Sequence, residues 1–428
     1  MLAPTTAVLT ALTLLAPAVP RPAPHARAAA RAAPGEAAHT KVVSADPVAH
    51  TPHVLDGIVT AFALVGRTVV VGGSFSRVRE ARGGATLERD NLFAFDVVTG
   101  RVSEAFAPVA DGPVAALAPG EGGTVYAGGS FGSIGGRRAA ALAKLRVTDG
   151  TTVPEFDPRV FGGDVSALVA HEGALYAGGD FIRVGRTPRP ALARLDPVTG
   201  APDPGFTVTP GDSISGRTKV IAMAATAGRL AVDGSFTTLD GLDRHQLGLI
   251  DISGATAKVA PWRTDAYKPV CREPFPTYVR GLDFSPRGDY FVVVTTGGYG
   301  GARKLCDTAA RFETFSRGDT IKPTWVNHTG GDSLYSVALT GAAIYVGGHQ
   351  RWLDNPRGHD DAGAGAVSRP GIGAIHPRTG KALRWNPTRD RGVGVKAFLP
   401  HRGGLLVGSD TTRLGREYHA RVGMFPLS

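Results

Sequence analysis

The chain has 428 residues, of which 58 are glycine and 31 are proline, and its formal net charge at pH 7 is +10. Hydrophobic residues make up 43% and charged residues only 20%, which excludes an intrinsically disordered chain, and the abundant glycine excludes a coiled coil. No apolar run reaches the roughly 18 residues of a membrane span, so the composition favours a turn-rich, mostly β protein.

The first part of the chain is typical of an export signal. An apolar stretch covers residues 7–19, and an Ala-Arg-Ala cleavage motif occurs twice after it. We therefore predict a secreted protein with a signal peptide over residues 1–32, a disordered linker over residues 33–43 and a folded domain over residues 44–428. The alternative is an uncleaved anchor or a disordered tail, because no lysine or arginine precedes the apolar stretch.

One short pattern recurs seven times after the linker: an apolar residue, any residue, a small residue and a second apolar residue. Successive copies begin about 55 residues apart, so that seven units fill residues 44–428. The copies are Val59–Phe62, Val114–Leu117, Val165–Leu168, Val220–Met223, Val279–Leu282, Leu334–Val337 and Val395–Phe398.

Three further markers follow in each unit. The second marker is an apolar strand that in most units ends in Gly-Gly, as in VYAGGSF at residues 125–131. The third marker is a strand that ends in a turn with Asp and Gly. The fourth marker is an aromatic residue near a proline. Four short strands in every unit predict an all-β, seven-bladed β-propeller of four-stranded blades. We expect Phe75, Phe131, Phe181 and Phe236 to pack between blades.

The two ends of the domain predict how the ring closes. The last unit stops after its third strand, at residues 420–425, whereas residues 42–55 precede the first unit. Residues 47–49 align with residues 108–110, which follow the fourth marker of the first unit. We therefore expect the N-terminal strand to complete the last blade, which removes a free sheet edge.

The stretches VYAGGSF (residues 125–131) and LYAGGDFIRVG with RPALARLDPVTG (residues 175–200) resemble the bacterial "delta-sixty" β-propeller repeats. This family occurs in exported proteins, especially those of actinobacteria. The resemblance therefore implies a propeller fold and export, and it implies no particular activity. The fourth unit departs from the pattern, with Asp233 in place of the first glycine, and the fifth unit has no Gly-Gly-x-Phe.

The chain has two cysteines, Cys271 and Cys306, and an isolated pair in an exported protein predicts a disulfide. They lie in two long loops of the fifth unit, at residues 264–278 and 297–308, which a propeller places on one face. A thiol pair for metal or redox chemistry is the alternative, although the spacing is not that of a C-x-x-C motif.

The loops of units five to seven on this face carry the candidate ligand-binding residues, which are Asp332, His349, Arg351, Trp352, Asp354 and Asp410. An aromatic residue beside polar and charged groups on a loop is typical of a sugar or peptide site. Each residue also has a structural alternative. Trp352 then caps its blade with Arg351 stacked on it or paired to Asp354, Asp332 caps a turn, and His349 is buried.

The sequence contains no G-x-S-x-G, H-E-x-x-H or Walker motif, so we assign no catalytic residue and favour a protein that is not an enzyme. No cofactor is expected, and the alternative is Ca²⁺ bound by oxygens of Asp354, Asn355, Asp360 and Asp361.

The predicted function is a monomeric binding module for an extracellular glycan, cell-wall polymer or protein. Basic residues are scattered among the acids, which argues against nucleic acid, and we expect no membrane span. One alternative is a propeller glycoside hydrolase or lyase, with Asp332, His349, Asp354 or Asp410 as acid or base and Arg351 on a substrate anion. The other is a structural surface protein without a small ligand.

Overall fold

The computed structural model of the chain describes residues 38–273 and 275–427. The predicted signal peptide, residues 1–32, and residues 33–37 of the predicted linker lie outside the described residues. Every regular element in the described range is a β-strand, which confirms the prediction of an all-β fold. Over the same range, no helix is long and apolar enough to cross a bilayer.

Seven antiparallel sheets, called sheets 1 to 7 in chain order, repeat one arrangement in the described residues. The first two strands form a hairpin, and the third lies against the second. Their strands are, sheet by sheet, β2 (Ile58–Val65), β3 (Thr68–Ser74) and β6 (Leu92–Asp96); β7 (Val114–Gly120), β8 (Thr124–Gly129) and β11 (Leu142–Arg146); β13 (Val165–His171), β14 (Ala174–Gly179) and β17 (Leu192–Leu195); β19 (Val220–Thr226), β20 (Arg229–Gly234), β23 (Leu247–Asp251) and β24 (Lys258–Val259); β25 (Val279–Phe284), β26 (Tyr290–Thr295), β27 (Thr308–Glu313) and β28 (Trp325–His328); β29 (Leu334–Leu339), β30 (Ile344–Gly348) and β33 (Ile372–Ile375); and β34 (Ala397–His401), β35 (Gly404–Gly408) and β38 (Val422–Pro426).

Short hairpins occupy most of the segments between the second and third strands. The sequence predicts loops for these segments. Three of the hairpins pair with a short strand from the preceding connection. These small sheets are β1 (His53–Val54), β4 (Arg77–Arg79) and β5 (Leu87–Glu88); β9 (Ser133–Ile134) and β10 (Arg137–Arg138); β12 (Val160–Phe161), β15 (Arg183–Val184) and β16 (Thr187–Pro188); β18 (Pro210–Gly211), β21 (Thr238–Leu239) and β22 (Leu242–Asp243); β31 (Trp352–Leu353) and β32 (Val367–Ser368); and β36 (Arg413–Leu414) and β37 (Glu417–Tyr418).

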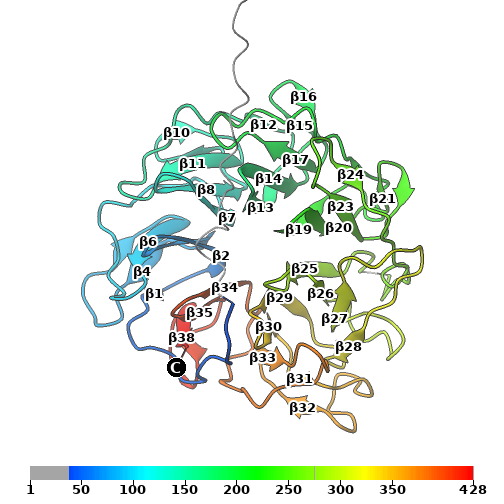
Figure 1. Cartoon of the computed structure of the whole chain (residues 1–428). Coiled ribbons are helices and arrows are strands. Elements are labelled where there is room, and N and C mark those ends of the chain that lie inside the picture. Colours follow the sequence, from blue (N-terminus) through cyan, green and yellow to red (C-terminus); the bar gives the residue numbers. More distant parts are fainter. Residues whose placement is uncertain (1–37, 274, 428) are drawn as a thin grey trace, which may run out of the picture. The chain divides into compact units, whose positions relative to one another are not determined.

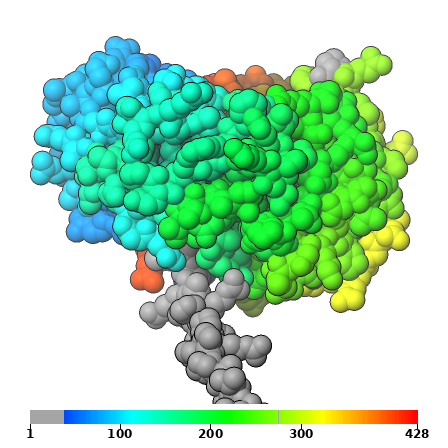
Figure 2. Space-filling view, turned by 90° about the horizontal axis from the view of Figure 1, so that it is seen from above, coloured from blue at the N-terminus to red at the C-terminus, as the bar shows by residue number. Residues whose placement is uncertain are grey.

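The first strands of the seven sheets lie side by side around a common axis (Figure 1). β2 packs against β7, each later first strand packs against the next one in chain order, and β34 also packs against β2. Glycine makes this approach possible, because a Cβ at Gly128 would lie 2.5 Å from the Val165 side chain of the next sheet, and one at Gly408 2.7 Å from that of Val59. Figure 2 views the sheets from the side, where they follow one another in chain order.

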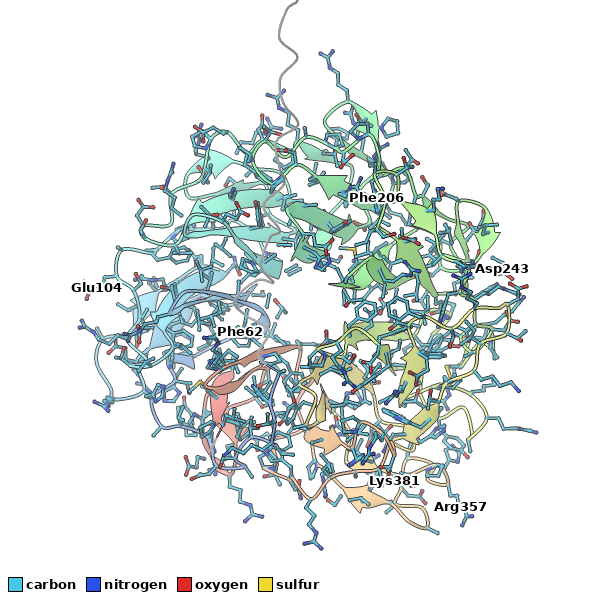
Figure 3. All side chains as sticks on the ribbon, in the orientation of Figure 1. Phe62, Glu104, Phe206, Asp243, Arg357 and Lys381 are labelled. Atoms are coloured by element: carbon cyan, nitrogen blue, oxygen red, sulfur yellow. A yellow bond between two sulfur atoms is a disulfide. The ribbon has the colours of Figure 1, made fainter. Side chains whose placement is uncertain are left out.

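Apolar side chains fill the spaces between neighbouring sheets. In Figure 3, Phe206 lies among the sheets, whereas Glu104 and Arg357 lie at their outer margin. The predicted core position that follows the glycine pair is buried in sheets 1 to 4, as expected, at Phe75, Phe131, Phe181 and Phe236. Burial of aliphatic and aromatic side chains between sheets therefore helps to hold the repeats together.

The prediction of four strands in every sheet needs correction, since five of the seven sheets have three. In those sheets the expected fourth strand is at most an isolated bridge, such as Leu145 to Thr152 and Leu195 to Pro202. Pro154 lies two residues beyond Thr152 and lacks the backbone donor that a longer ladder would need there.

The N-terminal segment of the described chain is held by sheets 6 and 7. The amides of Ser44 and Val48 donate to the carbonyls of Pro426 and Met424, at 2.8 and 2.9 Å. His39 is 3% exposed, and its ring nitrogen lies 2.9 Å from the carbonyl of His401. Residues 38–43 of the predicted linker therefore pack on the sheets, in place of the disorder expected for them.

Candidate functional site

Aspartates in the connections before the first strands clamp the hairpins that follow the second strands. Asp56 in sheet 1 and Asp111 in sheet 2 each accept a hydrogen bond at 2.8 Å from a backbone amide of that hairpin. Asp332 has the same place in sheet 6 and accepts a hydrogen bond from the Arg351 amide at 2.9 Å. The structural role that the sequence analysis left open for Asp332 is therefore one that the repeat uses elsewhere.

Asp332 differs from its counterparts because two arginines converge on it. Its carboxylate, 3% exposed, accepts hydrogen bonds from Nε of Arg351 at 2.8 Å and from a terminal nitrogen of Arg391 at 2.9 Å. The Arg351 side chain is 34% exposed and that of Arg391 is 56% exposed. A buried carboxylate thus fixes two guanidinium groups whose outer parts face solvent.

Arg351 also stacks on Trp352, whose ring centroid lies 4.3 Å from its guanidinium carbon. Trp352 is half-buried and pairs with Ser368 across the β31–β32 hairpin. The expected partners of Arg351 were the Trp352 ring and Asp354. Arg351 stacks on the ring, and its ion pair is with Asp332 instead of Asp354. The result is a rigid, half-exposed cation–aromatic pair.

The other two candidate acids are engaged by the protein. Asp354 accepts hydrogen bonds from the Asn327 amide group at 2.6 Å and from the Ala382 backbone at 3.1 Å. Asp410 accepts hydrogen bonds from the backbone amides of Val393 and Gly394, at 2.6 and 3.0 Å. These carboxylates hold loops in place, and each uses both of its oxygens to do so.

His349 lies at the end of β30, half-buried, with its ring 5.7 Å from that of Tyr335 in an edge-on contact. Burial lowers the pKa of His349, against the opposing effect of Asp332. The imidazole is therefore neutral at pH 7, and it connects the Asp332 network to the first strand of sheet 6.

Several polar residues near this face were not predicted from sequence. Gln350 stands where sheets 1 to 4 have the core phenylalanine, is fully buried, and makes no side-chain hydrogen bond to the described residues. Asp307, next to Cys306, is also fully buried, and burial raises its pKa to about 7. The signal available in the sequence was the departure of units five and six from the repeat pattern.

The residues considered for Ca²⁺ do not form a cluster of ligands. Asn355 is fully buried and bonds the carbonyls of Thr329 and Asp361 through its side-chain nitrogen. Asp361 accepts the backbone amide of His359 at 2.7 Å. Within residues 38–273 and 275–427, no group of three or more His, Cys, Asp or Glu is placed to hold a metal ion.

The predicted disulfide between Cys271 and Cys306 is present. It joins the connection between β24 and β25 to the connection between β26 and β27, and both cysteines are buried. Sheet 5 has no outer hairpin in the described residues, so the disulfide holds these loops where other sheets use hydrogen bonds.

Replacing both cysteines with serine is expected to lower the free energy of unfolding by about 3–4 kcal/mol, because the cross-link closes a long loop in the unfolded chain. Urea denaturation of the double variant and of the untreated protein measures the difference. A reductant should destabilise the original protein by a similar amount and leave the variant unchanged. Equal stability of all samples would contradict a stabilising role.

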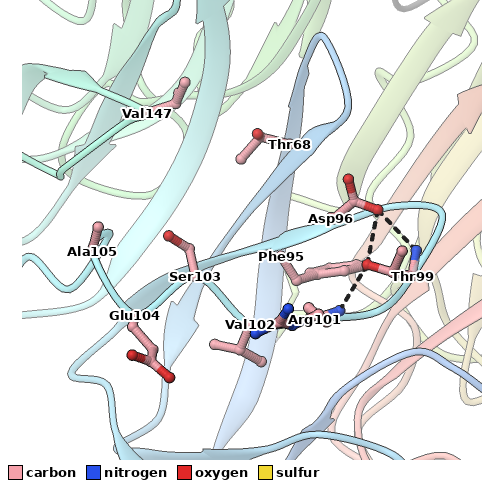
Figure 4. A pocket seen from close by; sticks show the side chains of 10 residues that line it. All are labelled: Thr68, Phe95, Asp96, Thr99, Arg101, Val102, Ser103, Glu104, Ala105 and Val147. Atoms are coloured by element: carbon pink, nitrogen blue, oxygen red, sulfur yellow. Dashed lines mark hydrogen bonds between the residues drawn. The ribbon is translucent and has the colours of Figure 1, made fainter.

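An open groove of about 530 Å³ lies away from these loops, beside the turn that follows β6 (Figure 4). Asp96 lines it, but its carboxylate accepts hydrogen bonds from the Val98 and Thr99 amides and from Arg67. Because the polar groups of this turn serve its own backbone, the groove has the features of a structural turn.

Comparisons with known proteins found one family match and similar solved structures. Residues 173–206 match a family described as a domain of unknown function (DUF5122) beta-propeller. The computationally designed Ika8 protein is 13% identical over 89% of this chain and 99% of its own, with a TM-score of 0.50. The WD40 beta propeller domain of Doa1 is 12% identical over 90% of this chain and 96% of its own, with a TM-score of 0.47. No curated protein sequence matches the chain. The family match thus assigns residues 173–206 a similarity to β-propeller repeats.

Proposed function

We propose that the chain is an exported, seven-bladed β-propeller that binds an extracellular ligand. Seven sheets with one strand order, and the packing of β34 against β2, support the blade number and a closed ring. Hydrogen bonds from residues 44–48 to β38 support closure by the N-terminal segment of a domain over residues 44–428. The disulfide and the signal-like sequence of residues 1–32 support export.

The observation that carries the binding function is the Arg351–Trp352 pair held by buried Asp332. An aromatic ring offers a flat apolar surface to a sugar, and a guanidinium group binds carboxylate or phosphate. Arg391, held by the same carboxylate, adds a second cation. The ligand class that fits this surface is a cell-wall saccharide that carries negatively charged groups.

This binding function has more support than hydrolysis. General acid–base catalysis needs a carboxyl group that is free to exchange a proton with substrate. Asp332 is buried between two arginines, and Asp354 and Asp410 are held by other protein groups. A preorganised cation–aromatic surface supports a ligand site rather than a purely structural role.

Thermal shift measurements with anionic and neutral wall polysaccharides test this proposal. The anionic polymer is expected to stabilise the protein, by about 2.7 kcal/mol at 100 times its Kd. Trp352→Ala and Arg351→Ala are expected to weaken binding at least tenfold, because each removes one part of the stacked pair.

Phe161 and Arg183 provide a matched control. The Arg183 guanidinium carbon lies 4.1 Å from the ring centroid of exposed Phe161, in the small sheet attached to sheet 3. Arg183→Ala removes a similar exposed pair at another place and should leave binding unchanged. Equal loss in Arg183→Ala and Arg351→Ala, or no response to any anionic polymer, would contradict the proposed site.

A further inference from the structure

One position of the repeat lies at the beginning of the first strands, which surround the common axis (Figure 1). It is the second residue of the four-residue pattern that recurs in the seven units. In sheets 1 to 6 a register shift between the first and second strands leaves this residue outside the regular pairing. Each of the seven residues is half-buried, whereas the residue before it is buried. They are Thr60, Ala115, Ser166, Ile221, Arg280, Tyr335 and Lys396.

The chemistry of this position changes between sheets 4 and 5. In the first four sheets the residue is small or uncharged, whereas sheets 5 to 7 supply Arg280, Tyr335 and Lys396. The Lys396 ammonium is 3.3 Å from the centroid of the Tyr335 ring, and Arg280 is close enough to interact electrostatically with Tyr335. The charges of Arg280 and Lys396 also influence each other.

The two cations in this cluster have no matching acid. Among the described residues, no carboxylate lies within ion-pair distance of Arg280 or Lys396. Asp233 is near Arg280 but fully buried, and burial raises its pKa to about 8, so that it is neutral at pH 7. Asp410 is near Lys396 but bonds backbone amides and pairs with Arg389.

Hydrogen-bond donors in the cluster also have spare capacity. Arg280 donates to the carbonyls of Val279 and Thr277, both at 2.9 Å. The Lys396 ammonium and the Tyr335 hydroxyl make no hydrogen bond to the described residues. Burial and the charge of Arg280 lower the pKa of Lys396 to about 8, against the opposing effect of Asp410.

We propose that Arg280, Tyr335 and Lys396 form an axial site for an anionic group, a carboxylate or phosphate of a small ligand. Such a group accepts hydrogen bonds from the lysine and the tyrosine and balances the two cations. The site is separate from the Arg351–Trp352 surface, although His349 contacts Tyr335 from that side.

Isothermal titration of the full chain at pH 7, in chloride buffer, tests this site with inorganic phosphate and with citrate. Saturable binding of one or both anions is expected. Binding of phosphate indicates a phosphate ligand, and binding of citrate indicates a carboxylate ligand. Lys396→Met should weaken binding at least tenfold, whereas Lys396→Arg keeps the charge and should retain it. Lys258→Met removes an exposed lysine from β24 and should bind as the original protein does.

Two results would overturn the axial site: no binding of either anion to the folded protein, or unchanged binding in Lys396→Met. Should Lys396→Met fail to fold, Tyr335→Phe tests the same site, since it removes only the hydroxyl and should still weaken binding severalfold. Trp352→Ala should keep the response to phosphate or citrate even if it loses polysaccharide binding. The two proposals can therefore fail independently.

Discussion

Replacing Asp233 with asparagine is expected to make the protein more stable above pH 7 and to remove most of its loss of stability between pH 6.5 and pH 8. Asp233 stands where most other sheets have a glycine that lets the next sheet approach. Its side chain is fully buried, and one carboxyl oxygen accepts the Ala222 amide at 2.9 Å while the other has no partner among the described residues.

The direction in which stability changes with pH follows from the pKa of Asp233. Burial raises the pKa of Asp233 from 3.8 to about 8, so that the folded protein keeps a proton that the unfolded chain has lost. Its contribution is fully favourable below pH 4 and is lost as the pH rises toward 8. Since one pKa unit corresponds to about 1.4 kcal/mol, the total change is several kcal/mol.

Other groups titrate in the same range and need controls. Asp307, with a pKa raised to about 7, changes stability in the same direction. His53 and His401, with pKa values lowered to about 4, act in the opposite direction below pH 6.5 because they stay neutral in the fold. The difference in stability between the original protein and each variant, measured by urea denaturation at several pH values, separates these contributions.

The side-chain amide introduced by Asp233→Asn keeps an acceptor for the Ala222 backbone and cannot ionise. Asp307→Asn is the matched control, and it should remove the dependence only up to about pH 7. An Asp233→Asn protein whose stability changes with pH as the original does would show that Asp233 titrates normally.

Replacing Asp332 with alanine is expected to destabilise the fold by about 3 kcal/mol, at the lower end of the range for breaking a buried ion pair. The carboxylate is 3% exposed and serves the Arg351 amide and two guanidinium groups. Arg351 and Arg391 are partly exposed, so water solvates both after Asp332 is removed. The loss of folding stability therefore stays near the lower end of the range.

Asp56→Ala is the matched control, since Asp56 makes the same type of clamp in sheet 1 and pairs with Arg77 at 3.1 Å. Asp56 is 28% exposed, so its removal should cost about 1 kcal/mol. Urea denaturation of both variants at pH 7 provides the comparison. A loss for Asp332→Ala no larger than that for Asp56→Ala would mean that the two arginines contribute nothing through this carboxylate.

The fold was largely readable from the sequence because the same local pattern occurs seven times. Glycine pairs at strand ends, the buried phenylalanines and the cysteine pair each have one dominant physical explanation, and the structure contains all three as expected. The outer fourth strand was overpredicted, because in five of the seven sheets the pairing at this place is at most a single bridge.

The candidate site was readable only in part. Its loops stood out because units five to seven depart from the repeat, and Trp352 stood out as a tryptophan outside the repeat positions. The sequence did not predict the roles of the acidic residues, because their partners lie in other segments of the chain. Asp332 pairs with Arg391, and Asp354 accepts a hydrogen bond from Asn327. A sequence pattern cannot show which acceptor a distant donor will use.

By itself, the sequence determined the first three strands of each unit, the repeat length and the positions that must be small or apolar, because the same local pattern recurs in every unit. Tertiary structure decided which polar groups meet. Arg280, Tyr335 and Lys396 are far apart in the chain, and they come together only because the first strands of sheets 5 to 7 pack side by side around one axis. Among the described residues neither Arg280 nor Lys396 has a carboxylate within ion-pair distance, and burial lowers the pKa of both cations, an environment that exists only in the folded protein.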